Sequence, residues 1–243
     1  MKKALMMALV VAMVSGSVMT QAHEKGAWIV RLGATTVDPD TDSDDIKLPG
    51  DEIGIPGAIT LQADVDDDTQ LGIIPAYMIT NNFAVEILLA TPFEHDIRAN
   101  GQGPIKGLNL DAGSTKQLPP TVSVQWYPRG GKSGWQPYIG AGVNYTIFFD
   151  EDVDNELKDT LGALIPGVNG ADLSLDDSWG FAGQVGVDIP FNDHWAFNMA
   201  VWYIDIDTTA KIDAKVDGAT VAKVKFDVDL DPWVYNIGIA YKF

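Results

Sequence analysis

Residues 231–243 alternate between large apolar side chains and small or polar ones, and this period of two constrains the fold most strongly. One parity holds Trp233, Tyr235, Ile237, Ile239, Tyr241 and Phe243, and the other holds Pro232, Val234, Asn236, Gly238, Ala240 and Lys242. Because successive side chains of a strand point to opposite faces, this segment predicts a strand with one large apolar face. A soluble sandwich also alternates, but aromatic residues at both ends of the apolar face are typical of a transmembrane barrel.

Seven further segments show the same alternation. They lie at 28–32, 71–79, 83–89, 122–126, 139–149, 179–189 and 195–203. Extended slightly at each end, each reaches the roughly 9–11 tilted residues that cross a bilayer. An even number of antiparallel strands can close without leaving a free edge in lipid. The sequence therefore predicts an all-β fold, an eight-stranded antiparallel transmembrane β-barrel.

The connections between these segments alternate in length. Short turns are expected at 80–82, 129–134 and 191–194, and long connections at roughly 38–69, 94–118, 150–177 and 206–228. This pattern is typical of outer-membrane barrels, whose short turns are periplasmic and whose long loops are extracellular. The long loops are acidic: residues 38–68 contain eleven Asp or Glu, and residues 150–177 contain nine. Such runs are usually solvated faces.

One of the long loops carries a helical pattern. Val153, Leu157, Leu161 and Leu164 recur at helical spacing, and Asp154 is suited to cap the helix. The sequence predicts a short amphipathic helix there, which either packs on the barrel rim or covers the pocket.

The amino-terminal segment has the composition of an export signal. Lys2 and Lys3 precede an apolar run from Ala4 to Val14, and small or polar residues follow up to Ala22. These features predict a secretory signal peptide at 1–22, followed by a single barrel domain at 23–243. The apolar run is too short to span a bilayer as a permanent anchor.

The overall charge and composition exclude several classes of protein. The chain of 243 residues contains 34 acidic and 16 basic residues, which gives a formal net charge of -18. This acidity argues against a nucleic-acid partner, because phosphate binding needs a basic patch. The 46% of hydrophobic residues excludes intrinsic disorder, and the lack of cysteine excludes disulfides and thiolate chemistry.

If the large apolar faces contact lipid, the intervening residues line the interior of the barrel. A polar set is then expected near the periplasmic end, and we predict that it forms a plug of Arg31, Glu86, Gln125, Asp188 and Asn198. An apolar set is expected towards the cell exterior, where it would form a solute-binding pocket of Ile74, Leu88, Phe148, Trp202 and Ile204. Eight strands enclose just enough room for side chains or one small ligand, so a wide aqueous pore is excluded.

Four stretches resemble the OmpW family of outer-membrane proteins. They are GAWIVRLGATTVDP at 26–39, PPTVSVQWYP at 119–128, QPYIGAGVNYTIFF at 136–149 and DPWVYNIGIAYKF at 231–243. The similarity extends over the whole chain after residue 22 and depends on the order and spacing of these pieces. It implies an eight-stranded barrel in the Gram-negative outer membrane. It also implies passage of small hydrophobic molecules through a narrow apolar pocket that opens sideways to lipid.

The lining residues favour the same mechanism. Apolar solutes would enter the pocket around Phe148, Trp202 and Ile204, stop above a plug that includes Arg31 and Glu86, and leave laterally into the bilayer. A structural or receptor-type barrel is the alternative. In that case Phe148 and Trp202 are packing residues, and the acidic loops bind partners or divalent cations, which could bridge to lipopolysaccharide phosphates.

Residues for catalysis or for a defined metal site are not expected. The run from Asp38 to Asp44 fails the EF-hand pattern, because Ser43 stands where the loop needs glycine and Pro49 where it needs glutamate. The three histidines, His23, His95 and His194, have no spacing partner for zinc or for a nucleophile. We therefore expect a protein that is not an enzyme and that has no cofactor.

Overall fold

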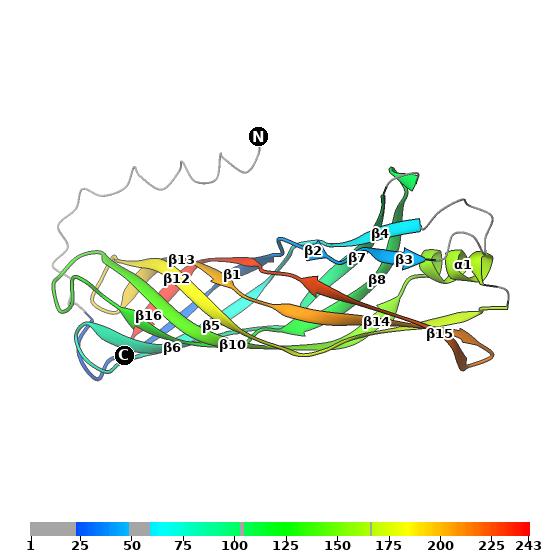
Figure 1. The fold of residues 1–243 in the computed structure, drawn as a ribbon. Coiled ribbons are helices and arrows are strands. Elements are labelled where there is room, and N and C mark those ends of the chain that lie inside the picture. Colours follow the sequence, from blue (N-terminus) through cyan, green and yellow to red (C-terminus); the bar gives the residue numbers. More distant parts are fainter. Residues whose placement is uncertain (1–22, 49–58, 103–104, 166) are drawn as a thin grey trace.

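The computed structural model describes residues 23–48, 59–102, 105–165 and 167–243. The predicted signal peptide at 1–22 lies outside the described residues. The molecule is elongated: a closed barrel with the short turns and the carboxyl terminus occupies one end, and strands extend beyond the barrel at the other (Figure 1).

Eight strands form the barrel. They are β1 (Trp28–Asp38), β5 (Asp68–Met78), β6 (Phe83–Ala90), β9 (Thr121–Trp126), β10 (Gln136–Val153), β12 (Ser178–Pro190), β13 (Trp195–Ile204) and β16 (Trp233–Lys242). Each pairs antiparallel with the next in this order, and β16 pairs with β1 to close the ring. The eight-stranded antiparallel barrel expected from the alternation is confirmed.

The large side chains of the alternating pattern cover the outside of the barrel. Ile237, Val185 and Phe197, for example, are 68%, 56% and 55% exposed, as lipid-facing residues should be. Aromatic rings meet at both ends of this apolar belt, with centroids 4.4–5.3 Å apart: Tyr145–Trp179 and Tyr203–Trp233 near the extension, and Trp28–Tyr77 and Trp195–Tyr241 near the short turns. These are the two girdles of a membrane-spanning barrel.

The four long connections contain more regular structure than the sequence indicated. They form β2 (Asp42–Ser43), β3 (Ile46–Leu48), β4 (Ile59–Val65), β7 (Phe93–Gln102), β8 (Asn109–Leu118), α1 (Asn155–Leu164), β11 (Gly170–Leu175), β14 (Asp207–Val216) and β15 (Ala219–Asp229). We call these elements, with the outer part of β10, the outer extension. The 18 residues of β10 rise roughly 60 Å in all, about twice the thickness of a bilayer core. The strands therefore continue well beyond the membrane.

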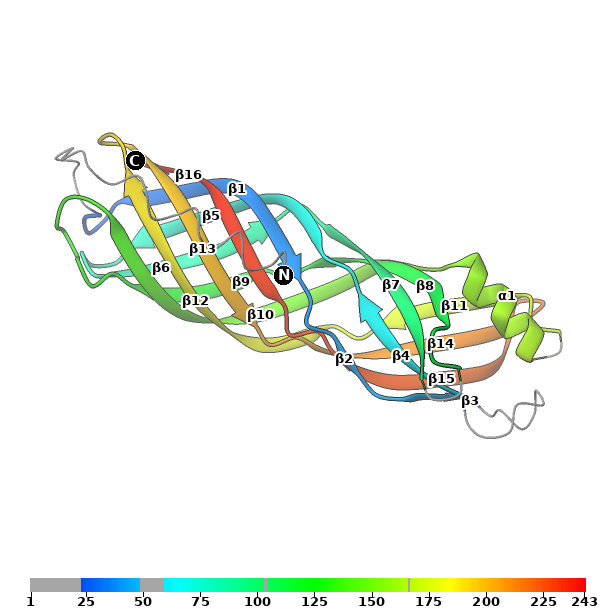
Figure 2. The ribbon, with the colours of Figure 1, turned by 90° about the horizontal axis from the view of Figure 1, so that it is seen from above.

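The outer extension consists of two sheets. One runs β3-β4-β7-β8-β10 and continues from the barrel wall, and the other runs β11-β14-β15-β2 (Figure 2). Buried residues such as Leu61, Ala99, Ala210 and Phe226 belong to the same apolar core as the barrel interior. On β14 the inward residues include two alanines, and the outward ones are Lys, Asp and Thr. The apolar signal of such strands is weak, which explains why the sequence indicated only connections.

The predicted amphipathic helix is present as α1. The Asp154 side chain accepts a hydrogen bond from the backbone N–H of Glu156 at 2.8 Å and caps the amino terminus. Leu157 and Leu161 are buried in a small apolar cluster with Val153 and Val168. The described residues include no helix that is long and apolar enough to cross a membrane.

Candidate functional site

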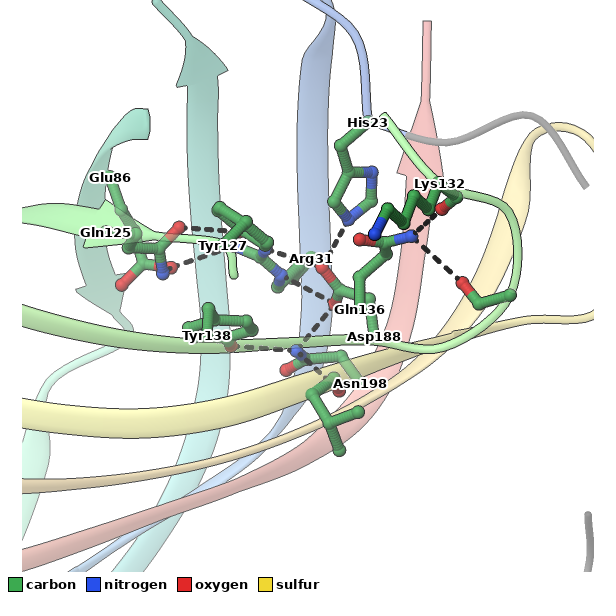
Figure 3. Close-up of polar contacts among 12 residues, drawn as sticks. His23, Arg31, Glu86, Gln125, Tyr127, Lys132, Gln136, Tyr138, Asp188 and Asn198 are labelled. Atoms are coloured by element: carbon green, nitrogen blue, oxygen red, sulfur yellow. Dashed lines mark hydrogen bonds and ion pairs between the residues drawn. The ribbon is translucent and has the colours of Figure 1, made fainter. Parts of the chain in front are cut away.

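Arg31 lies at the centre of the barrel interior near the short turns. Its guanidinium group donates from Nε to Asp188 Oδ1 at 3.0 Å and from Nη2 to Asp188 Oδ2 at 2.7 Å, and from Nη1 to Glu86 Oε2 at 2.8 Å (Figure 3). All three residues are completely buried. The paired contact with Asp188 has the planar fork geometry that makes arginine–carboxylate pairs strong.

Amides complete the hydrogen bonding of the two carboxylates. Gln125 Nε2 donates to Glu86 Oε2 at 2.5 Å, and Asn198 Nδ2 donates to Asp188 Oδ1 at 2.8 Å. Gln184 Nε2 binds the other oxygen of Glu86 at 3.0 Å. The structure thus brings Arg31, Glu86, Gln125, Asp188 and Asn198 into one buried network, which we call the polar plug. Its effect on passage through the barrel stays a prediction.

Gln184 and several other residues that the sequence analysis did not assign to this network take part in it. Tyr127 OH accepts from Arg31 Nη2 at 2.7 Å, and Tyr138 OH accepts from Asn198 at 3.0 Å while its ring lies 5.0 Å from the Arg31 guanidinium carbon. His23 Nε2 lies 2.9 Å from Asp188 Oδ2. Tyr138 on β10 and Tyr127, the residue directly after β9, both have inward parity, so the alternation could have revealed them. His23 precedes the first strand and carries no such signal.

An apolar cavity of about 80 Å³ lies in the outer extension, between its two sheets and beneath α1. Its lining includes Leu61, Val65, Phe148, Leu157, Phe226 and Leu230. Of the five predicted pocket residues, Phe148 lines this cavity. Ile74, Leu88, Trp202 and Ile204 are buried in the apolar core and do not line it. The structure therefore places the cavity in the outer extension, where the sequence had indicated loops.

A hydrogen-bonded pair of polar residues interrupts the apolar lining of this cavity. His95 on β7 lies with Nδ1 2.6 Å from the backbone oxygen of Asp66, and Gln117 Nε2 lies 2.8 Å from His95 Nε2. His95 is 1% exposed, and this burial lowers the pKa of its imidazole below the usual value. The hydrogen bond to Asp66 and the carboxylates of Asp67, Asp68 and Asp96 oppose that shift without reversing it.

The barrel wall has a break beside the cavity. Pairing of β6 with β9 ends at Leu88↔Thr121, and pairing of β7 with β8 begins at Phe93↔Gln117. The intervening segments 89–92 and 118–120 contain Pro92, Pro119 and Pro120, which have no N–H to donate to a ladder. The pairing is therefore interrupted at this level, next to Gln117.

Three carboxylates at the outer rim of the barrel could hold a cation. Ligand oxygens of Asp205, Asp207 and Asp231 lie within 4.8 Å of one another. Asp231 already accepts hydrogen bonds from Tyr203 OH at 2.9 Å and from the Ile206 N–H at 3.2 Å, so it also holds the strand ends together. Burial and the neighbouring carboxylates raise the pKa of Asp207, as expected for like charges at close range.

The closed barrel, its apolar belt, the two aromatic girdles and the short turns at one end define an integral protein of the Gram-negative outer membrane. Residues 24–243 match the OmpW family, and the chain belongs to that family. Outer membrane protein W of Escherichia coli K12 is 41% identical over 244 residues, with complete coverage of both chains. Relatives of this kind are outer-membrane barrels.

Solved structures and more distant relatives agree with this assignment. The crystal structure of the outer membrane protein OprG from Pseudomonas aeruginosa is 46% identical, with a TM-score of 0.75. The match covers 91% of this chain and 98% of OprG. The dibenzothiophene metabolism operon protein PahQ of P. aeruginosa is 28% identical over 222 residues, which is 90% of each chain.

Proposed function

We propose that this protein is a channel for the passive uptake of small hydrophobic molecules across the outer membrane. The observation that carries the proposal is the order of the interior: an apolar cavity opens in the outer extension, and a buried, charged plug fills the barrel at the other end. Such an interior admits an apolar solute from outside the cell and does not provide an aqueous path through the barrel.

The energetics favour entry into the cavity and oppose further descent. An apolar solute gains roughly 25 cal/mol for each Å² that it removes from water. To pass the plug it would have to displace the hydrogen bonds of Arg31 to Glu86 and Asp188 and leave these charges without partners. The solute therefore stops in the apolar part of the interior.

Exit sideways into the bilayer is the second part of the proposal. The break in strand pairing between Leu88↔Thr121 and Phe93↔Gln117 supports it, because this part of the wall can separate without breaking a complete ladder of hydrogen bonds. Ile87 and Leu89, beside the break, are exposed on the outer surface of the barrel and would contact lipid. A solute that leaves here stays in apolar surroundings.

The name of one relative is consistent with a hydrophobic solute. PahQ is named for an operon of dibenzothiophene metabolism, and dibenzothiophene is a polycyclic aromatic compound. By similarity, we propose aromatic hydrocarbons as a first class of solute to test.

Uptake of naphthalene by cells with and without the protein tests the proposed function. We expect faster uptake with the wild type and loss of this gain in Ala210→Trp, which fills the cavity from β14. Val221→Trp, at a 52% exposed position of β15, is the matched control and should behave as wild type. Heat-dependent mobility of the barrel on gels confirms that each variant is folded. Equal uptake in all strains would contradict the channel and favour the structural or receptor-type alternative.

A further inference from the structure

We infer that the cavity selects hydrophobic solutes that carry one hydrogen-bond donor, such as aliphatic alcohols or phenols, and that Gln117 Oε1 accepts this hydrogen bond. The inference rests on the proposed function, because it names the class of solute that the same cavity would take. It depends on the hydrogen bonding of His95 and Gln117.

The orientation of the Gln117 amide follows from its neighbours. The backbone oxygen of Asp66 can only accept, so the proton of neutral His95 is on Nδ1, 2.6 Å away. His95 Nε2 is then an acceptor and needs a donor, which Gln117 Nε2 supplies at 2.8 Å. The amide cannot be reversed without placing two acceptors against each other. The oxygen of Gln117 is therefore the amide atom that has no partner among the described residues.

Gln117 Oε1 is buried and meets no hydrogen-bond donor among the described residues. Gln117 itself is only 2% exposed and lines the cavity. Other polar lining groups do have partners: Thr208 donates to the backbone oxygen of Asp176 at 2.6 Å, and Arg98 binds Asp66 at 2.5 Å. Buried acceptors are almost always paired in proteins, so an unpaired one on a residue that lines an apolar cavity points to a ligand with a donor.

The position of Gln117 fits a site on the path to the bilayer. Gln117 pairs with Phe93 in the first β7–β8 pair beyond the wall break, and with Phe148 of β10 on its other side. A solute whose hydroxyl group binds Gln117 would lie with its apolar body among residues such as Phe148 and Leu61. Its polar group would then be at the wall break.

The charges around the site exclude an anionic solute. Asp67, Asp68 and Asp96 all act on the His95 ring next to Gln117, and Arg98 is already paired with Asp66. A carboxylate solute would enter this negative field without a free cation to bind. The acceptor oxygen also cannot bind a solute whose polar group only accepts. Neutral hydroxyl compounds satisfy both conditions.

Binding of 2-naphthol and of 2-methoxynaphthalene to the purified, refolded protein tests the inference. The two compounds share the aromatic body, but the ether has no donor. We expect wild type to bind the naphthol roughly five- to tenfold more tightly than the ether, as one hydrogen bond would give. In Gln117→Met this preference should fall to about one while the ether binds as before. Binding is measured by fluorescence titration in one detergent, so that partition of the two compounds into micelles is the same for all variants.

Gln62→Met is the matched control. Gln62 lies on β4 between the lining residues Leu61 and Ala63, so it faces away from the cavity. The same substitution there should leave the preference unchanged.

A preference that persists in Gln117→Met, or equal binding of both compounds to wild type, would overturn the inference. If either of these results is found but naphthalene uptake still depends on the protein, the proposed channel is supported and only the class of hydroxyl solutes is rejected. If Gln117→Met loses the preference but the protein does not speed naphthalene uptake by cells, the hydrogen-bonding site is supported and the channel is overturned.

Discussion

Individual polar residues of the interior differ in whether their hydrogen bonds are complete. Arg31 uses Nε, Nη1 and Nη2 to bind Asp188, Glu86 and Tyr127, so its charge is compensated on every side. Gln117 uses Nε2 to bind His95, and its acceptor oxygen is unpaired. The first arrangement is costly to disturb, since removal of one partner leaves a buried charge. The second has a place for a ligand.

Acidification should loosen the outer extension through His95. Burial lowers the pKa of folded His95, so the unfolded chain takes up a proton first as the pH falls through about 6.5. The stabilising effect of neutral His95 is therefore complete above this pH and is lost as the pH falls through the lower, folded pKa. Protection factors of the β7 amides, which correct for the slower intrinsic exchange at low pH, should be smaller at pH 5 than at pH 7.5. In His95→Gln this difference should shrink; an unchanged difference would show that another group is responsible.

At the scale of elements, the seam between β1 and β16 depends on two glycines. Gly33 and Gly238 face each other in the register of these strands. A Cβ atom on Gly238 would lie 2.1 Å from the backbone oxygen of Leu32, and one on Gly33 would lie 2.5 Å from that of Ile237. Backbone atoms cannot move aside like the end of a flexible side chain. The close approach of the first and last strands therefore requires glycine.

Gly238→Ala should destabilise the barrel, whereas Gly183→Ala should not. The first change forces the closing strands apart, and overpacking of this kind costs about 1–3 kcal/mol. Gly183 lies on β12, and a Cβ atom added there would have no neighbour within 4 Å, so the same change meets open space. Urea unfolding of the two variants in lipid vesicles measures the difference in the free energy of unfolding. Equal stabilities would show that the seam can relax.

The whole molecule combines a membrane-spanning barrel with an outer extension of similar construction. The barrel contains the polar plug, and the extension contains the apolar cavity. Because the same strand, β10, runs through both parts, the cavity and the barrel interior share a continuous wall. The interior is therefore polar and charged near the short turns, whereas the apolar space lies in the extension.

In planar bilayers the protein should show no large, steady ionic conductance. The side chains of the plug are buried and bind one another, so we expect no open path for hydrated ions. Ala210→Trp should leave the conductance unchanged, because it fills the cavity rather than the plug. A large, steady current through wild type would contradict both the plug and the lateral route.

The sequence by itself determined the eight spanning strands, the inward or outward direction of their side chains, the short turns and the helix at 155–164. These features follow from local periodicity. One face of each strand contacts lipid and the other lines the interior, so the polarity of a residue indicates which face it is on. The inward position of Arg31, Glu86 and Asp188 could be derived in this way. Tyr127 and Tyr138 could have been derived by the same rule.

Only the tertiary structure decided which inward residues meet and where the empty space lies. Arg31 and Asp188 are 157 positions apart, and their contact depends on the stagger with which all eight strands close. The extension is built from strands with small inward residues such as Ala63, Ala99 and Ala210, whose local apolar signal is weak. Ala63 and Ala99, paired in one sheet, and Ala210 in the other sheet line the cavity, and their small side chains leave space between the sheets. That packing involves residues far apart in the chain, so no local sequence pattern predicts it.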